Sequence, residues 1–192
     1  RKNIQSIAKD TLLLEAKAIE RLIDYIDADF ESCVEAIHKC NGRVIVTGIG
    51  KSANIATKIV ATLNSTGTQA SFMHAADAIH GDLGMVGKED IIICLSKSGN
   101  TPEIKVLVPL LKSIGSKLVA LVGNTNSFLA TNADFILNAT IEREADPNNL
   151  APTTSTTASL ALADALAVCL LQLKKFSSTD FAKYHPGGAL GK

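Results

Sequence analysis

The stretch Val44-Ile45-Val46-Thr47-Gly48-Ile49-Gly50-Lys51-Ser52 joins a short apolar run to a glycine-rich turn, and helix-forming residues follow it. A second stretch, Ser96-Lys97-Ser98-Gly99-Asn100-Thr101-Pro102-Glu103, follows another apolar run and combines a glycine with several hydroxyls. Each turn places backbone N–H groups and hydroxyls at the start of a helix, where unpaired donors and the helix dipole favour an anion. The two turns together predict a phosphate site, and we expect the phosphate to belong to a small metabolite.

Five apolar runs alternate with helix-forming stretches after residue 43. Such alternation requires right-handed crossovers and gives a parallel sheet with helices on both faces. We therefore expect an α/β fold of three α/β/α layers around a five-stranded parallel sheet of flavodoxin-like type. Its ligand site should lie at the carboxyl ends of the strands. The runs are Val44–Thr47, Gln69–Met73, Ile91–Leu95, Leu118–Val122 and Phe135–Leu137.

Helices are expected before the sheet. Apolar residues recur at helical spacing within Ile4–Asp27, and Asp29 then suits the N-cap of a second helix that closes at Gly42. At 192 residues the chain fits one domain, made of N-terminal helices over 1–42 and an α/β core over 43–192.

A long apolar helix is expected near the C-terminal end. Ser155 or a neighbouring threonine would cap it, and it covers 157–173 with apolar residues on nearly every side. Such a helix is buried either in the sheet domain or against another subunit. We find no uninterrupted apolar run long enough for a membrane span.

Composition excludes several classes of partner. The sequence is 46% hydrophobic and 20% charged, and its 19 basic and 19 acidic residues balance. A chain without excess positive charge has no electrostatic basis for binding nucleic acid or an anionic membrane. Its four cysteines form no CxxC pair, which favours free thiols in a reducing cytoplasm. They are Cys33, Cys40, Cys94 and Cys169.

The first glycine turn does not match a nucleotide-binding motif. A Walker A loop needs a glycine five positions before its Gly-Lys pair, and Ile45 stands there. The looser dinucleotide fingerprint Gly48-x-Gly50-x-x-Ala53 fits, but the second strand ends in Ser71-Phe72-Met73-His74, without the acidic residue that would hold a ribose. Taken alone, this turn is explained as well by a tight strand-to-helix connection as by a ligand site.

The second turn is more specific. Helix capping needs one hydroxyl, whereas Ser96–Thr101 supplies three around a glycine, as a nest for phosphoryl oxygens would. Glu103 falls in the first helical turn, close to the expected anion. It is therefore a candidate for chemistry or for positioning Lys51, and an interaction with the helix dipole is the alternative.

The four histidines differ in their expected roles. His38 lies on a predicted surface helix and is expected to be solvated, whereas His74 and His80 flank a turn at the ligand edge of the sheet. One of these two is expected to reach the pocket. His185 is held by a proline and two glycines, too rigidly for a chance surface residue. No HExxH or Cys/His spacing supports a metal site.

Two glutamates, Glu142 and Glu144, precede a third hydroxyl cluster, Thr153–Thr157. The chain leaves a predicted strand at this point, and only one of the two carboxylates is expected to face the site. The residue pattern does not say which one.

Six motifs resemble the SIS (sugar isomerase) domain, and specifically the arabinose-5-phosphate isomerases of lipopolysaccharide and capsule biosynthesis. HGDLGMV and HPGGALGK are the most specific of them, whereas the SxSGNT loop occurs throughout the superfamily. The motifs are GIGKS at 48–52, STGT at 65–68, HGDLGMV at 80–86, SKSGNTPEI at 96–104, LAPTTSTTASLALADALAV at 150–168 and HPGGALGK at 185–192.

The resemblance implies the reversible conversion of D-ribulose 5-phosphate to D-arabinose 5-phosphate through a cis-enediol, toward the eight-carbon sugar Kdo. It implies no organic cofactor, and any metal bound by the chain is expected to be opportunistic or inhibitory. Two sets of residues match the family's functional positions. The catalytic set is Lys51, Glu103, Glu144, His80 and His185, and the phosphate-binding set is Gly50, Ser52, Ser96, Ser98, Gly99, Asn100 and Thr101.

Within this set our hypothesis makes Glu144 the base that moves the proton between carbons, because one tuned carboxylate can serve both steps. Lys51 would anchor the phosphate and stabilise charge, and His185 would act as an acid at the ring or carbonyl oxygen. Glu103 and His80 would orient groups or serve as secondary acids and bases. A hexulose-phosphate isomerase and a non-catalytic module that senses a sugar phosphate are the alternatives.

The resemblance also implies a cytoplasmic homotetramer with active sites near subunit boundaries, where one or both motif histidines reach a neighbour's pocket. Many family members continue after HPGGALG into a pair of regulatory CBS domains, whereas this sequence stops at Lys192. It is either a naturally minimal isomerase or part of a longer chain. In the first case we expect a downstream product, CMP-Kdo, to inhibit by occupying the active site.

Overall fold

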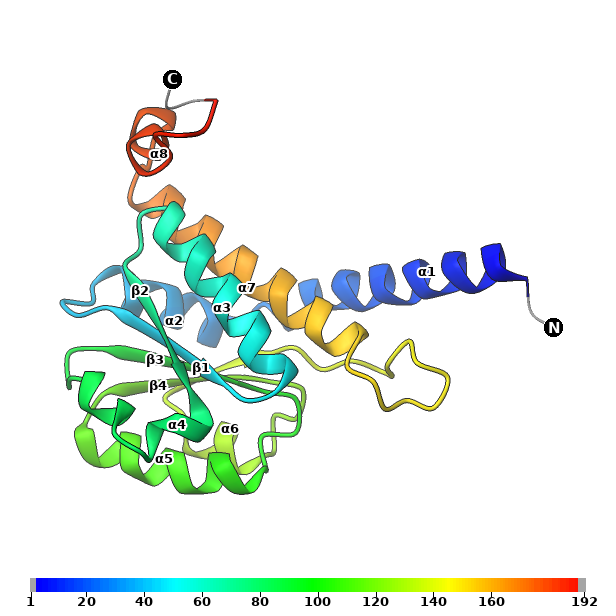
Figure 1. The fold of residues 1–192 in the computed structure, drawn as a ribbon, viewed down its shortest axis with the longest axis horizontal. Coiled ribbons are helices and arrows are strands. Elements are labelled where there is room, and N and C mark those ends of the chain that lie inside the picture. The colour runs from blue at the N-terminus through cyan, green and yellow to red at the C-terminus, as the bar shows by residue number, and fades with distance from the viewer. Residues whose placement is uncertain (1–2, 190–192) are drawn as a thin grey trace.

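Five parallel strands form one sheet in the order β2-β1-β3-β4-β5 (Figure 1). All five apolar runs are strands, with ends shifted by at most one residue, and the predicted flavodoxin-like sheet is confirmed. The computed structural model describes residues 3–189. The strands are β1 (Val44–Gly48), β2 (Ala70–His74), β3 (Ile91–Ser96), β4 (Lys117–Val122) and β5 (Phe135–Asn138).

Side chains that alternate along the strands supply two separate cores. Val44 and Val46 of β1 join a cluster under α2, α3 and α7, whereas Ile45 joins a cluster under α4, α5 and α6. This alternation produces the predicted three layers, because each face of the sheet is apolar and must be covered. The covering helices are α2 (Ala28–His38), α3 (Lys51–Ser65), α4 (Ala75–Ala78), α5 (Pro102–Ile114), α6 (Phe128–Asn132) and α7 (Thr154–Leu173).

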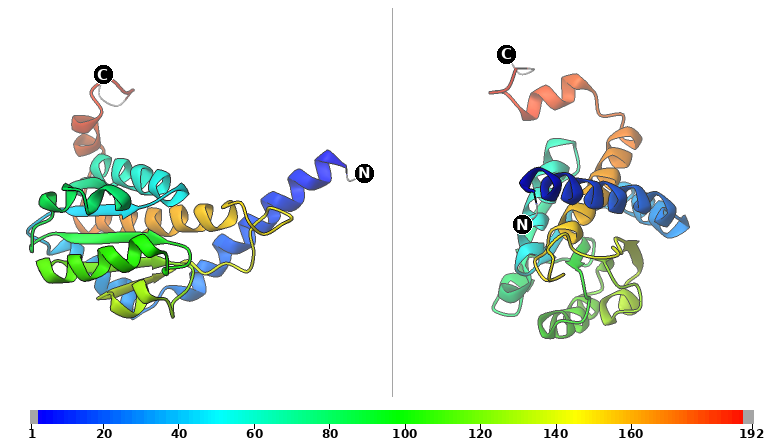
Figure 2. Two further views of the ribbon diagram at one scale, coloured as in Figure 1. Left: turned by 60° about the horizontal axis from the view of Figure 1, so that its bottom comes forward. Right: turned by 90° about the vertical axis from the view of Figure 1, so that its right-hand side faces the viewer.

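The first helix, α1 (Ile4–Leu22), leaves the domain. Its last turns contact α7 through Ala18 and Leu22, while its N-terminal half projects away from the rest of the chain (Figures 1 and 2). Ile4 and Leu12 are therefore 71% and 67% exposed. Large apolar side chains on a projecting helix indicate a surface that a partner covers.

The predicted cap of the second helix is wrong by two residues. Asp27 is the N-cap of α2, and its Oδ1 accepts a hydrogen bond from the Phe30 N–H at 3.0 Å. A short helix, η1 (Ile23–Tyr25), precedes it. The Asp29 carboxylate instead accepts from the Ile136 N–H at 2.6 Å and ties α2 to β5. The expectation failed because this long-range contact with β5, which the local sequence does not indicate, uses the Asp29 carboxylate.

Helix α7 begins three residues before the predicted start and buries one face instead of all sides. Eight of its residues are buried, whereas Val168 and Leu173 are about half exposed. By length and composition alone α7 could cross a membrane, although it contains no uninterrupted apolar run of that length. Its contacts with α1, α2 and α3 are those of a helix packed into a domain.

Two cysteines should resist modification in the folded protein. Cys33 and Cys94 are both 0% exposed, and burial raises the pKa of each thiol to about 12, with Asp29 adding to the effect at Cys33. The thiolate is the reactive form, so iodoacetamide at neutral pH should leave both unmodified until the chain is unfolded. Peptide mass spectrometry before and after denaturation checks this; alkylation of Cys94 in the native protein would contradict it.

Candidate functional site

The site lies at the carboxyl ends of β1 and β3, where the connections that follow the two strands lead to opposite faces of the sheet. β1 and β3 are neighbours, but β1 continues into α3 on one face and β3 into α5 on the other, so the two loops diverge at the strand ends. Such a switch point is where open parallel sheets bind ligands. A cavity of about 160 Å³ opens there, lined by Ile49, Lys51, Ser52, Ile55, Leu95, Lys97, Pro152, Ser155, Thr156 and Ser159.

The first glycine turn supplies one wall of this cavity. Gly50 is the N-cap of α3 with φ +63°, and it offers no side chain to cap the helix. The N-terminus of α3 is therefore left available to an anion. Lys51 and Ser52 both line the cavity, and Lys51 forms no ion pair within residues 3–189. This wall carries uncompensated positive charge.

The hydroxyls of the second turn are held by the turn itself. Ser96 Oγ is buried and accepts from the Gly99 N–H at 2.9 Å, and Ser98 Oγ accepts from the Asn100 N–H at 3.2 Å. Thr101 Oγ1 caps α5 through the Ile104 N–H at 3.4 Å. Each hydroxyl uses its oxygen in these bonds and keeps its own hydrogen free to donate to an anion.

Asn100 has a structural contact outside this turn. Its Oδ1 accepts from the Phe128 N–H at 2.9 Å, at the start of α6, and the Gly99 carbonyl accepts from the Leu129 N–H at 3.0 Å. The predicted phosphate loop is thereby attached to α6. Residues 96 and 98–101 do not line the cavity themselves but adjoin Lys97, which does.

The two glutamates before the third hydroxyl cluster differ in exposure. Glu142 is exposed and lies 3.5 Å from Arg21 of α1. Glu144 is completely buried. Its Oε1 accepts from the N–H groups of Thr153 (3.1 Å) and Ser155 (2.9 Å).

The other oxygen of Glu144, Oε2, accepts from Lys97 Nζ at 2.8 Å and from Ser155 Oγ at 2.6 Å. Desolvation of the buried carboxylate raises its pKa, but these hydrogen bonds together outweigh desolvation and leave the pKa below its ordinary value. Glu144 also replaces a capping hydroxyl for α7, since the N-cap Thr153 makes no side-chain cap bond. It lies behind Lys97 and Ser155 and does not line the cavity.

The residue that sequence reasoning missed is Lys97. No local pattern marks it, because a charged residue between Ser96 and Ser98 looks solvated in the sequence. The α7 hydroxyls of Ser155, Thr156 and Ser159 are further additions to the site, although the third hydroxyl cluster indicated a helix N-terminus there. Two of the predicted residues, Lys51 and Ser52, line the cavity with them.

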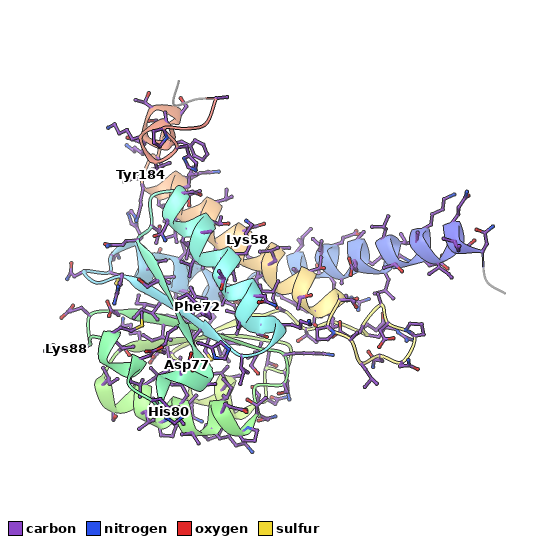
Figure 3. All side chains as sticks on the ribbon, viewed as in Figure 1. Lys58, Phe72, Asp77, His80, Lys88 and Tyr184 are labelled. Atoms are coloured by element: carbon purple, nitrogen blue, oxygen red, sulfur yellow. The ribbon has the colours of Figure 1, made fainter. Side chains whose placement is uncertain are left out.

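Glu103 and the predicted catalytic histidines lie elsewhere in this chain. Glu103 is exposed in the first turn of α5. His80 is exposed next to α4, and Figure 3 shows it on the opposite side of the domain from Tyr184. That tyrosine ends the last helix, α8 (Ser178–Tyr184).

His185 follows α8 directly. Its ring stacks on Phe181 at 3.7 Å between centroids, and Nδ1 lies 2.7 Å from the Phe181 carbonyl oxygen. The predicted motif at 185–192 continues beyond the described residues.

Two other histidines have simpler roles. His38 is exposed, as predicted. His74 Nδ1 accepts from the Ala76 N–H at 3.1 Å and caps α4. Within residues 3–189, no group of three or more His, Cys, Asp or Glu side chains is arranged to hold a metal ion.

Comparison with known proteins gives the family. The SIS domain model matches residues 36–169. The chain is 48% identical over 192 residues to a probable arabinose 5-phosphate isomerase of Haemophilus influenzae, and 46% identical over 185 residues to arabinose 5-phosphate isomerase KpsF of Escherichia coli O6:H1. These matches cover 100% and 96% of the chain but 57% of each relative, so the chain spans little more than half the length of both.

A solved structure has the same fold over nearly the same length. E. coli CFT073 c3406, in complex with arabinose 5-phosphate, superposes with a TM-score of 0.91 at 40% identity, and the match covers 96% of this chain and 100% of that one. The family model, the sequence relatives and this structure agree. The chain belongs to the SIS domain family.

Proposed function

We propose that this chain is the isomerase domain of a D-arabinose-5-phosphate isomerase, a single SIS domain that interconverts D-ribulose 5-phosphate and D-arabinose 5-phosphate and supplies Kdo biosynthesis for lipopolysaccharide or capsule. Relatives with 46–48% identity carry that activity in their names, and the c3406 structure holds arabinose 5-phosphate. The observation that carries the proposal is one cavity lined by two lysines and by hydroxyls from two helix N-termini. It suits a small polar anion.

The reaction moves one proton from C1 to C2 and one from O1 to O2, and no atoms enter or leave. A base removes a proton from C1 of the ketose, the electron pair forms the C1–C2 double bond, and the C2 carbonyl oxygen takes up a proton. O1 then loses its proton and becomes the carbonyl oxygen while a proton returns to C2, which gives the aldose. The protein must bind the phosphate, hold a base beside C1 and C2, and stabilise the oxygens of the enediol.

Lys51, Gly50 and Ser52 are proposed to bind the phosphate together with the second turn. The N-terminus of α3 and the free charge of Lys51 support this, as do the hydroxyl hydrogens of Ser96, Ser98 and Thr101. The backbone of Gly99 gives this turn its shape. Asn100 is proposed to contribute through its backbone, since its side-chain oxygen is bonded to α6.

The identity of the base stays a prediction. The sequence hypothesis gives this role to Glu144, but that residue is buried and accepts four hydrogen bonds, whereas a proton shuttle needs a lone pair that faces the substrate. The described cavity lining contains no imidazole and no carboxylate. We therefore propose that a base among Glu103, His80 and His185 completes the site, and that it comes from a neighbouring chain.

A homotetramer would bring these residues together. The projecting half of α1 exposes large apolar side chains, and an apolar groove of about 420 Å³ runs between α2 and α7 beside the exposed Val168 and Leu173. Surfaces of this kind are covered in stable oligomers. We also propose that the enzyme is cytoplasmic, that it uses no organic cofactor, and that CMP-Kdo inhibits it competitively at the same cavity.

The test is to incubate the protein with ribulose 5-phosphate in deuterated water and to follow arabinose 5-phosphate by NMR. We expect product that carries deuterium at C2, because the enediol exchanges its proton with solvent through the base. No turnover would contradict the proposed substrate. Turnover of a hexulose phosphate instead would favour the related isomerase, and tight binding of sugar phosphates with no turnover would favour a sensor.

A further inference from the structure

We propose that Lys97 is a catalytic residue that stabilises the enediol oxygen, and that Glu144 is the positioning residue that holds it. The inference rests on the proposed function, since it assigns a role in that reaction. It follows from how Lys97 is fixed, from the charge around it, and from the number of donors it still offers.

Three contacts fix Lys97 in place. Its carbonyl accepts a hydrogen bond from the Gly123 N–H at 3.0 Å, at the end of β4. A Cβ on Gly123 would lie 3.2 Å from Lys97 Cγ, so the lysine stem packs directly against this glycine. At its far end, Nζ is 2.8 Å from the buried Glu144 Oε2. A flexible lysine is thereby held as a rigid donor, which is what electrostatic stabilisation of a transition state requires.

The charge at Lys97 is suited to a sugar oxygen and not to a phosphate. Its ammonium is paired with the Glu144 carboxylate, so the net charge at that end of the cavity is close to zero. A phosphate dianion placed there would face an ammonium whose charge the buried carboxylate already offsets, whereas Lys51, which also lines the cavity, has no such partner among the described residues. The two lysines therefore orient the substrate, with its phosphate toward Lys51 and its carbonyl end toward Lys97.

Lys97 keeps donors for the substrate after pairing with Glu144. An ammonium has three N–H bonds, and the ion pair is the one hydrogen bond that Nζ makes within the part of the chain that the structure describes. The side chain is 48% exposed and lines the cavity, while Glu144 is 0% exposed. An N–H of Lys97 can thus bond the carbonyl oxygen as negative charge develops there, with the proton on carbon taken by the separate base.

The experiment compares Lys97→Met with Lys51→Met, using two probes. One probe, the hydroxamate of erythronate 4-phosphate, resembles the enediolate, because its N–O group stands for C1 and O1; the other, arabinitol 5-phosphate, has the phosphate but no carbonyl. K97M is expected to lower kcat by about 100-fold or more, with KM changed less than about 3-fold, because its interaction forms in the transition state. It should weaken hydroxamate binding by a similar factor and leave arabinitol phosphate binding nearly unchanged. K51M should weaken both probes equally.

Equal weakening of both probes by K97M would overturn the assignment, because it would make Lys97 a phosphate ligand. So would a fall in kcat of less than about 5-fold, which is smaller than the loss of one oxyanion donor. Lys97→Arg keeps the ion pair and controls for folding, and a matched melting temperature is required of every variant. No turnover by the wild type would contradict the proposed function, while the two probes would still test where Lys97 binds.

A double-mutant cycle tests the positioning role of Glu144. If Glu144 acts through Lys97, E144Q should lower kcat in the wild type and add little in the K97M background, because the two residues act as one unit. If Glu144 is itself the base, E144Q should abolish the remaining turnover in both backgrounds. That second result would overturn the positioning role and restore the assignment made from the sequence.

Discussion

Replacing Gly99 with alanine should destabilise the protein by roughly 2–5 kcal/mol, as the combined cost of a positive φ and of overpacking. Gly99 has φ +68°, and a Cβ there would lie 2.1 Å from Ser127 Oγ and 2.5 Å from Ser127 Cβ. Ser127 is buried and caps α6 through the Ala130 N–H, so it cannot move without uncapping that helix. Either α6 or the turn Ser96–Thr101 must shift.

The same substitution should abolish binding of sugar phosphates, because the backbone of the turn fixes the positions of its three hydroxyls. Thermal denaturation measures the first effect, and calorimetric titration with arabinitol 5-phosphate measures the second. Gly50→Ala is the matched control, because Gly50 also has a positive φ, at +63°, but nothing lies within 4 Å of an added Cβ. Its loss of stability should be limited to the backbone cost of about 1–3 kcal/mol, without the added cost of overpacking.

Removing the obstruction should rescue the variant in part. Gly99→Ala combined with Ser127→Gly deletes both atoms that the new methyl group meets, and Leu129 Cβ at 3.5 Å is then at ordinary contact distance. We expect the double variant to be more stable than Gly99→Ala alone, although Ser127→Gly by itself weakens the cap of α6. A Gly99→Ala protein with wild-type stability would show that the turn and α6 are not locked together.

The sheet could be predicted because its signal is local. In β1 and β3 every residue is buried, so each strand forms a continuous apolar run, and a turn with glycine or hydroxyls marks its end. Tertiary packing did not have to be known. The α2 cap shows the opposite case, since Asp27 and Asp29 both suit an N-cap, and a contact with Ile136, more than a hundred residues away, decides between them.

The site could be predicted only in part for the same reason. Lys51 and Ser52 follow a strand directly, so their place at the ligand edge is dictated by the first turn. The pair of Lys97 and Glu144 joins loops 47 residues apart, and nothing local to either residue indicates the other. A charged residue between two serines looks solvated in a sequence, and only the approach of the Glu144 segment gives it a fixed position.

Acid should destabilise the protein through Glu144, and Glu144→Gln should remove that part of the pH dependence. The pKa of this carboxyl is lowered in the folded state, so its contribution to stability is complete above the unfolded pKa of about 4.3 and is lost as pH falls through the folded pKa. At neutral pH we expect E144Q to cost roughly 2–3 kcal/mol, a value reduced from that of a fully buried pair because Lys97 is half exposed.

The measurement is the free energy of unfolding in urea from pH 7 to pH 3 for both proteins, and the informative quantity is their difference. Two other carboxyls also have lowered pKa values, and both remain in E144Q. Asp146 accepts hydrogen bonds from the backbone N–H groups of Ala151, Asn148 and Leu150. Asp180 accepts hydrogen bonds from Ser177. Their contributions cancel in the difference. The difference in unfolding free energy between the two proteins should therefore be constant down to about pH 5. It should shrink below about pH 4, as the wild-type carboxylate is protonated and its advantage over glutamine disappears. A difference that stays constant to pH 3 would mean that the pKa of Glu144 lies still lower. A difference that grows with acid would mean that burial outweighs the four hydrogen bonds. The carboxyl would then be easier to protonate in the folded protein than in the unfolded chain.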